Sequence, residues 1–241
     1  MLVSLLSPDL HMHTFILTVR KGSFVRHGLT LSQCHTEATF QILAGSDTTA
    51  TAIRATFLHI ITAPVIYQTL RQEIDNAISQ GQISSPIITY SEATRLPYLQ
   101  AVIYEGLRIW PPFNGLPFKL VPKGGDYIAG KFVPEGTRIA PNTPVVNTLG
   151  DIFGDHYDVH EFRPERWLDA DAEKVAEMKR VAELVFGYGR WMCAGKHLAF
   201  MELNKVFVEV SFPLSLSLSL SLSLSLYNLD HIGEKGLLTQ I

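Results

Sequence analysis

Apolar residues recur at helical spacing in the first third of the chain. Over residues 31–62 they follow a period close to 3.6, interrupted in the middle by small and polar residues. The apolar members are Phe40, Leu43, Ile53, Phe57, Ile60 and Ile61. Pro64 ends this helix and can begin the next, whose apolar residues lie four apart and which Gly81 follows as a cap would. The pattern predicts two consecutive helices.

Proline and glycine mark the elements that follow. The stretch YLQAVIYEGLRIWPP (98–112) predicts a third helix that its prolines stop, because proline disfavours helical geometry in the preceding residue. The stretch YIAGKFVPEGTRIA (127–140) predicts a hairpin around Pro134, Glu135 and Gly136. A charged helix over 171–184 and an apolar stripe beyond Gly195 complete the pattern. We therefore expect a mainly α chain with a small β-sheet.

The end of the chain follows a different rule. From Leu214 to Leu226 leucine and serine alternate without exception, which no packing requirement would impose. A repeated thymine–cytosine dinucleotide gives this alternation in any reading frame, which favours a translated simple repeat over a native amphipathic strand. Alternation would also place every leucine on one face of an extended strand, so the segment is an aggregation hazard.

Composition limits the classes of function. With 46% hydrophobic and 18% charged residues, the 241-residue chain can bury a sizeable core. A net charge of -3 gives no field that would hold nucleic acid or an anionic membrane by electrostatics alone. Two cysteines, Cys34 and Cys193, make no disulfide framework, which fits a reducing compartment. No apolar run reaches the length of a membrane span, and no basic signal-peptide head is present.

The stretch AGSDTT (44–49) lies in the middle of the first helix. Inside a helix, glycine lowers helix stability by about 1 kcal/mol relative to alanine. Threonine hydroxyls can form hydrogen bonds with the backbone carbonyl four residues earlier. We therefore expect a bulge or kink. Asp47 beside the hydroxyl of Thr48 would suit proton delivery to a bound molecule, whereas the alternative is a solvated, weak helical segment.

Glu105 and Arg108 lie one helical turn apart on the third helix. Such pairs are common on surfaces and contribute a few tenths of a kcal/mol there. Their apolar neighbours indicate that part of this pair is buried, and a buried pair needs further hydrogen bonds. Arg166, in FRPERW (162–167), could complete a Glu-Arg-Arg cluster.

The stretch FGYGRWMCAGK (186–196) places Cys193 among three glycines, just before an apolar helix. A thiol at the N-terminal end of a helix feels the dipole and unpaired N–H groups, which favour thiolate. Gly189 and Gly195 remove side chains where a flat ligand would approach the backbone. A buried small hydrophobic residue is the alternative interpretation of Cys193 and the predicted one for Cys34.

Together, and in this order, the four stretches resemble the signatures of the cytochrome P-450 superfamily, the haem-thiolate monooxygenases. FGYGRWMCAG is similar to the family's Phe-x-x-Gly-x-Arg-x-Cys-x-Gly loop. The other three are similar to Ala/Gly-Gly-x-Asp-Thr-Thr, Glu-x-x-Arg and Pro-Glu-Arg-Phe. The surrounding residues resemble fungal members of the pisatin-demethylase kind, typical of secondary metabolism.

The resemblance implies a role for each matching residue. Cys193 would be the axial thiolate ligand of the iron of haem b, and Phe186 would pack near it. Asp47 and Thr48 match the acid and alcohol that supply protons to bound oxygen. The residues that match a structural charge cluster are Glu105, Arg108 and Arg166. The other positions expected beside the cofactor are Ala44, Gly45, Gly187, Gly189, Arg190, Trp191, Gly195 and Lys119.

Two positions depart from the family pattern. Trp191 stands where the loop usually has an arginine that binds a haem propionate. An indole N–H can donate one hydrogen bond but supplies no charge, so Arg190 or Lys119 is expected to compensate. Trp167 replaces the usual phenylalanine, which we interpret as a mild change between aromatic residues.

The resemblance implies the C-terminal part of the P-450 fold, truncated, because the family's domain is about twice as long as this chain. We expect a lead-in over residues 1–30, a haem-binding half over 31–212, the Ser-Leu repeat over 213–226 and a remnant over 227–241. The missing half would carry the membrane anchor and most substrate-recognition loops. The family's location is the cytosolic face of the endoplasmic reticulum membrane.

Two functions of different classes follow. The first is a monooxygenase that takes electrons from an NADPH-dependent cytochrome reductase and inserts one oxygen atom from O2 into a lipophilic substrate. The second is a non-catalytic fragment that keeps the signatures but cannot hold haem. A third interpretation, a zinc or nucleophilic site at Cys193 and His197, lacks an orienting partner or further ligands. His156 and His160, beside two aspartates, could hold a metal, but a solvated loop is favoured.

Overall fold

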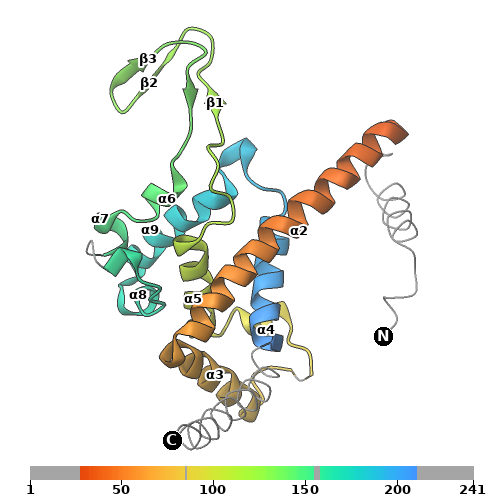
Figure 1. Ribbon diagram of the computed structural model, residues 1–241, viewed down its shortest axis with the longest axis vertical. Coiled ribbons are helices and arrows are strands. Elements are labelled where there is room, and N and C mark those ends of the chain that lie inside the picture. The colour runs from red at the N-terminus through yellow and green to blue at the C-terminus, as the bar shows by residue number, and fades with distance from the viewer. Residues whose placement is uncertain (1–27, 85, 155–157, 211–241) are drawn as a thin grey trace, which may run out of the picture. The chain divides into compact units, whose positions relative to one another are not determined.

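The computed structural model describes residues 28–84, 86–154 and 158–210 (Figure 1). The chain divides into two units, Met1–Thr51 and Ala52–Ile241, each of which is considered by itself. The Ser-Leu repeat, the remnant that follows it, most of the lead-in and His156 lie outside the described residues. No single helix in the described ranges is long and apolar enough to cross a bilayer, although one bent pair of helices satisfies that test jointly.

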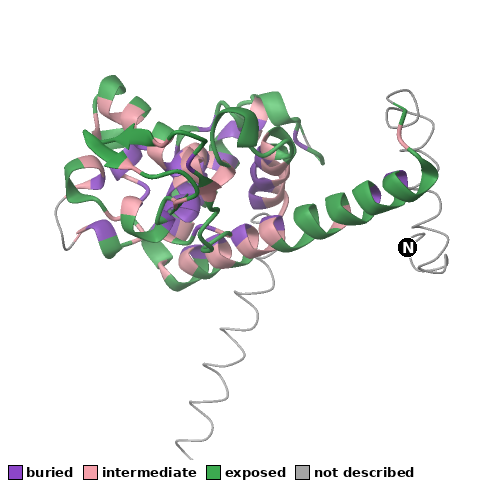
Figure 2. Cartoon of the chain, turned by 90° about the horizontal axis from the view of Figure 1, so that it is seen from above, coloured by how far each residue is buried: buried purple, intermediate pink, exposed green. Residues whose placement is uncertain are grey.

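Helix α2 (Leu31–Thr62) has the predicted bounds; its residues up to Thr51 belong to the first unit and the rest to the second. Most of its residues in the first unit are exposed (Figure 2), but Cys34 is buried, as expected. The predicted bulge or kink at residues 44–49 is wrong, because the helix is α-helical throughout. The Thr48 hydroxyl does donate to the Ala44 carbonyl at 2.7 Å, but this bond adds to the helical ladder without interrupting it.

In the second unit, α3 (Pro64–Ser79) and α5 (Pro97–Ile109) both begin with proline, whose fixed φ suits the first helical turn. Helix α3 buries Ile66, Leu70 and Ile74, and Gly81 follows it at a φ of 64°, as the predicted cap requires. Helix α5 ends before the prolines at 111 and 112, as predicted. The short helix α4 (Tyr90–Ala93) precedes it and begins with a capping box.

The later part of the second unit contains several short helical segments. They are α6 (Thr143–Val146), α7 (Gly150–Phe153), η3 (Asp158–His160), α8 (Arg166–Asp169), η4 (Glu183–Phe186) and η5 (Gly189–Trp191). The predicted charged helix is α9 (Ala172–Ala182), and a helix over residues 196–210 carries the last apolar stripe.

Helix α5 lies between the two hydrophobic clusters of this unit. Val102 and Leu107 belong to the larger cluster, with residues of α3 and of the helix over 196–210. Ala101 belongs to the smaller one, with residues of α7, α8 and α9. Because α5 contributes to both cores, its polar side chains can reach several elements at once.

Among the described residues, the β-structure consists of two small antiparallel sheets. Strand β2 (Asp126–Ile128) pairs with β3 (Lys131–Val133), and β1 (Lys119–Leu120) pairs with β4 (Arg138–Ile139). The predicted turn of the hairpin is wrong: the chain reverses at Ala129 and Gly130, whose φ values are 49° and 76°. Two consecutive positive φ values are what a tight type I′ hairpin requires. Residues 134–136 form a separate turn between β3 and β4, which do not pair with each other.

Candidate functional site

The cysteine loop, residues 186–196, joins η4 to the helix over 196–210 and confirms the predicted place of Cys193 on a glycine-rich turn before an apolar helix. The Cys193 N–H donates to the Phe186 carbonyl at 2.6 Å, and the Lys196 N–H donates to the Cys193 carbonyl at 3.3 Å. Gly187 has a φ of 76°, and a Cβ there would lie 2.7 Å from the Trp191 carbonyl oxygen. Only glycine therefore fits the start of this turn.

The thiol of Cys193 is exposed, so the alternative interpretation as a buried hydrophobic residue is wrong. A Cβ at Gly195 would lie 3.7 Å from Sγ, and a Cβ at Gly189 would meet nothing within 4 Å. Within the described ranges, no group of three or more His, Cys, Asp or Glu residues is placed to hold a metal ion. This arrangement does not support a zinc site with His197. A lone accessible thiol beside bare backbone fits a flat cofactor whose metal already has ligands of its own.

Two cations flank Trp191, the residue that departs from the family pattern. The Nζ atom of Lys119, on β1, lies 4.2 Å from the centroid of the indole ring. The Cζ atom of Arg190 lies 4.7 Å from the same centroid. Both distances are typical of cation–π contacts. The two residues expected to compensate for the missing arginine therefore meet at Trp191.

Glu105, Arg108 and Arg166 form a buried ionic cluster, as the sequence predicts. Arg108 donates to both oxygens of Glu105, at 2.8 and 2.7 Å, and Arg166 Nε donates to Oε1 at 2.9 Å. Arg108 also donates to the backbone carbonyls of Asn147 and Val159, at 3.0 and 2.7 Å. These bonds offset the cost of burying three charges and join α5 to the segments around residues 147 and 159.

Trp167 is a member of this cluster, which corrects its interpretation as a mild change. Its Nε1 atom donates to Glu105 Oε2 at 2.9 Å, a bond that phenylalanine could not make. Asp158 pairs with Arg166 at 3.0 Å. Burial raises the pKa of Asp158, but Arg166 and Arg163 together outweigh burial and leave the pKa below its ordinary value. No local pattern indicates the indole bond, because Trp167 lies 62 positions from Glu105.

Phe186 connects the cysteine loop to an aromatic cluster. Its ring centroid lies 5.5 Å from that of Phe200, which lies 5.6 Å from that of Tyr104. The Tyr104 ring lies in turn 5.3 Å from Trp167. A continuous set of packed rings therefore runs from the ionic cluster to the loop. The Phe186 carbonyl accepts from the Cys193 N–H, and the packing of its ring near the thiol stays a prediction.

The residues of AGSDTT belong to the first unit and are described only within it. Ala44, Gly45 and Asp47 are exposed there, and Thr48 is half-buried. The Thr48 hydroxyl uses its proton in the bond to Ala44, which leaves its oxygen able to accept a hydrogen bond. Proton delivery by Asp47 and Thr48 stays a prediction.

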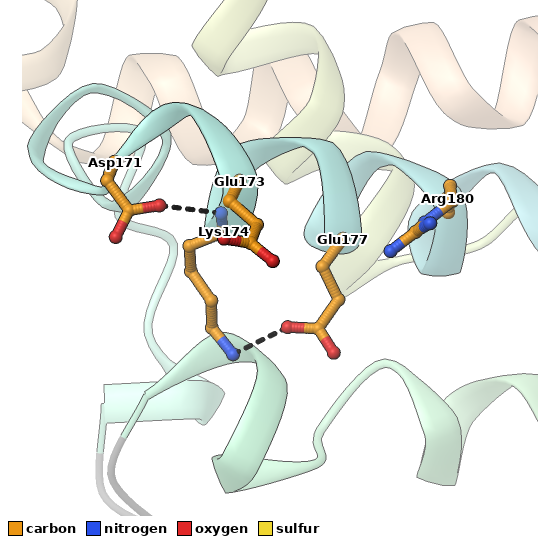
Figure 3. Close-up of a pocket in the computed structure, with 5 residues that line it drawn as sticks. All are labelled: Asp171, Glu173, Lys174, Glu177 and Arg180. Atoms are coloured by element: carbon orange, nitrogen blue, oxygen red, sulfur yellow. Dashed lines mark hydrogen bonds and ion pairs between the residues drawn. The ribbon is translucent and has the colours of Figure 1, made fainter.

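An open depression of about 260 Å³ lies along α9 (Figure 3). Its lining residues are Asp171, Glu173, Lys174, Glu177 and Arg180. Asp171 caps the helix by accepting from the Lys174 N–H, and the Lys174 ammonium pairs with Glu177 at 2.8 Å. All lining residues belong to this one helix and its cap, so the depression is the charged outer face of α9 and contains none of the predicted site residues.

The chain is similar to known proteins over most of its length. The family model named Cytochrome P450 matches residues 9–210. Cytochrome P450 monooxygenase ABA1 of Pyricularia oryzae is 52% identical over 189 residues, which are 78% of this chain and 36% of that protein. Cytochrome P450 monooxygenase aba1 of Botryotinia fuckeliana is 49% identical over the same shares of the two chains. The chain thus spans little more than a third of the length of these relatives.

Proposed function

This chain belongs to the cytochrome P450 family, and we propose on that basis that it is the haem-binding part of a monooxygenase acting on a lipophilic organic substrate. The observation that carries the proposal is the exposed thiol of Cys193, presented ahead of an apolar helix on a loop of glycines. The order of the four signature stretches and the 52% identity to a fungal monooxygenase support it. One atom of O2 would be inserted into the substrate.

The residues around Cys193 fit haem b. A thiolate ligand supplies electron density to the iron, which favours cleavage of the O–O bond. Cys193 would be that ligand, and Gly189 and Gly195 would let the flat ring approach the backbone. The loop reaches its conformation through its own backbone, since the Cys193 N–H is bonded to the Phe186 carbonyl.

Lys119 and Arg190 would bind the carboxylates of the cofactor in place of the family's arginine. Both cations lie over the Trp191 ring, which restricts their positions without neutralising them. Within the described part of the chain, neither has a carboxylate partner, so both can form charge-assisted hydrogen bonds with a propionate.

Asp47 and Thr48 would hold and transfer protons on the substrate side. The carboxylate of Asp47 is exposed, and the Thr48 oxygen can accept one hydrogen bond while its own proton is used at Ala44. Ala44 and Gly45, with small or no side chains, would leave room for O2 and substrate.

The ionic cluster would support the site without taking part in the chemistry. Glu105, Arg108 and Arg166 are at most 5% exposed, so no substrate can reach them. An NADPH-dependent cytochrome reductase would supply the electrons, at the cytosolic face of the endoplasmic reticulum membrane.

The test is the spectrum of the haem-loaded chain after reduction and addition of carbon monoxide. A thiolate ligand gives a strongly red-shifted Soret band, which we expect for the wild type and for Cys34→Ser. Cys193→Ser should lose the shifted band. An unchanged spectrum in Cys193→Ser would show that the ligand lies elsewhere.

A non-catalytic fragment is the second candidate function. It is favoured by the limited coverage of the relatives, 36% of ABA1. Haem titration of the folded chain separates the two. A chain that keeps its helical circular dichroism but takes up no haem supports the fragment, and saturable uptake supports the monooxygenase.

A further inference from the structure

Glu183 joins α5 to both ends of the cysteine loop. Its Oε1 atom accepts a hydrogen bond from the Tyr104 hydroxyl at 2.8 Å. Its Oε2 atom accepts from Lys196 Nζ at 2.6 Å. Glu183 begins η4, directly before the loop, and Lys196 begins the helix that follows Cys193. One carboxylate therefore connects the segments on either side of the loop with a third element.

The loop depends on these ends because it has little burial of its own. All residues from 187 to 195 are exposed, whereas Phe186 and Lys196 are half-buried. Residues 187–195 therefore gain little from apolar burial, and ring packing positions the loop only at Phe186. Inside the loop, the bond from the Cys193 N–H to the Phe186 carbonyl sets its shape but not its position.

The three side chains are suited to a lasting contact. The side chains of Glu183 and Lys196 are 28% and 19% exposed, so solvent screens this ion pair less than an open surface pair. Burial, and then the hydrogen bond to Glu183, raises the pKa of Tyr104 above its ordinary range. The phenol therefore stays protonated and remains a donor. The Tyr104 ring packs between Phe200 and Trp167, which holds the hydroxyl in place.

We propose that Tyr104, Glu183 and Lys196 are positioning residues that fix the Cys193 loop against α5. The inference rests on the proposed function in one respect: the loop is taken to present the thiolate to haem. In the absence of Glu183, the loop would keep little more than its backbone bonds and the ring packing of Phe186, and Cys193 would sample several positions.

Hydrogen exchange of the haem-free folded chain, followed by mass spectrometry, tests this proposal. Peptides covering residues 186–196 report on the loop, and peptides from α3 serve as the internal reference. Glu183→Gln and Tyr104→Phe should each speed exchange in the loop by at least about five-fold, with α3 unchanged. Lys196→Met should do the same, whereas Lys196→Arg should keep the protection because a guanidinium can still pair with Glu183.

Glu177→Gln is the matched control. It makes the same chemical change at an α9 residue and removes the more exposed pair with Lys174, which lies on the same helix. We expect wild-type exchange in the loop of this variant. Two results would overturn the proposal: wild-type loop exchange in Glu183→Gln, or equal acceleration in the loop and in α3. Tyr104→Phe keeps the packed ring and decides the question if Glu183→Gln fails to fold.

A second arm separates this proposal from the proposed function. After haem loading, Glu183→Gln should release haem several-fold faster than Glu177→Gln while global stability is similar. A wild-type chain that binds no haem contradicts the proposed function and leaves the exchange result valid. Wild-type loop exchange in Glu183→Gln, together with a shifted Soret band in the haem-loaded wild type, contradicts the positioning role and leaves the proposed function intact.

Discussion

Trp167 shows how much a single side chain can change the ionic cluster. Trp167→Phe would keep an aromatic ring beside Tyr104 and Phe153 but remove the donor to buried Glu105. A buried carboxylate with one partner fewer costs about 1–3 kcal/mol, so we expect the free energy of unfolding to fall by that amount. Urea denaturation measures it. Trp110→Phe, at a residue that is 53% exposed, is the control and should change stability by less than about 0.5 kcal/mol. Equal effects of the two changes would contradict the role given to the indole N–H.

Gly106 on α5 lies against Thr56, in the part of α2 that belongs to the second unit. A Cβ at this position would lie 2.0 Å from the Oγ1 atom of Thr56, which is itself 2% exposed. Gly106→Ala must therefore displace the Thr56 side chain or the helix backbone, and we expect a loss of about 1–3 kcal/mol in thermal or urea unfolding.

A second substitution checks the cause of that loss. Thr56→Ala removes the two closest side-chain atoms and should restore part of the stability of Gly106→Ala, which a double-mutant cycle would measure. Gly150→Ala is the matched control, because a Cβ there meets nothing within 4 Å. If Gly106→Ala were as mild as Gly150→Ala, the close approach of the two helices would not be needed for stability.

At the scale of elements, the capping box of α4 makes a pH-dependent contribution to stability. Backbone donation from Thr89, followed by the hydroxyls of Ser84 and Thr89, lowers the pKa of Glu92 from 4.5 to about 2. A depressed folded-state pKa means that the contribution is present above pH 4.5 and is lost as the pH falls through about 2. The wild type should therefore have a higher melting temperature than Glu92→Gln at pH 7. The two melting temperatures should converge near pH 2. A difference in melting temperature that did not change with pH would contradict this assignment.

The long helices could be predicted because their signals are local. Apolar periodicity and the prolines at 64, 111 and 112 define α2, α3 and α5 within the segments that form them. The hairpin was misplaced because Pro134 to Gly136 do form a turn, while strand pairing depends on the positive φ of Ala129, a residue that sequence statistics do not favour there. The prediction of a kink in α2 was wrong for a related reason. Residues such as glycine and threonine lower the local helix propensity, but the neighbouring helical turns can keep the helix intact.

At the scale of the whole molecule, the site could be predicted only where a motif names its residues. The Glu105 cluster was predicted through its motifs, and the structure brings its members together, whereas the role of Cys193 stays a prediction. The partners Trp167 and Glu183 were missed because each meets α5 from a segment more than 60 positions away, where no local pattern indicates the contact. Long-range contacts of this kind are determined by packing, which a single sequence does not reveal.

Haem should stabilise the second unit if it binds there through Cys193. A ligand that binds only the folded chain adds about 2.7 kcal/mol at a concentration of 100 Kd, so thermal unfolding of the wild type should shift upward as haem is added. Cys193→Ser should remove most of this shift, whereas Cys34→Ser should keep it because Cys34 belongs to the first unit. Circular dichroism at increasing haem concentrations measures the shift. Non-specific adsorption of an apolar ring would stabilise or destabilise all three chains alike, so an equal shift in Cys193→Ser and the wild type would contradict ligation by this thiol.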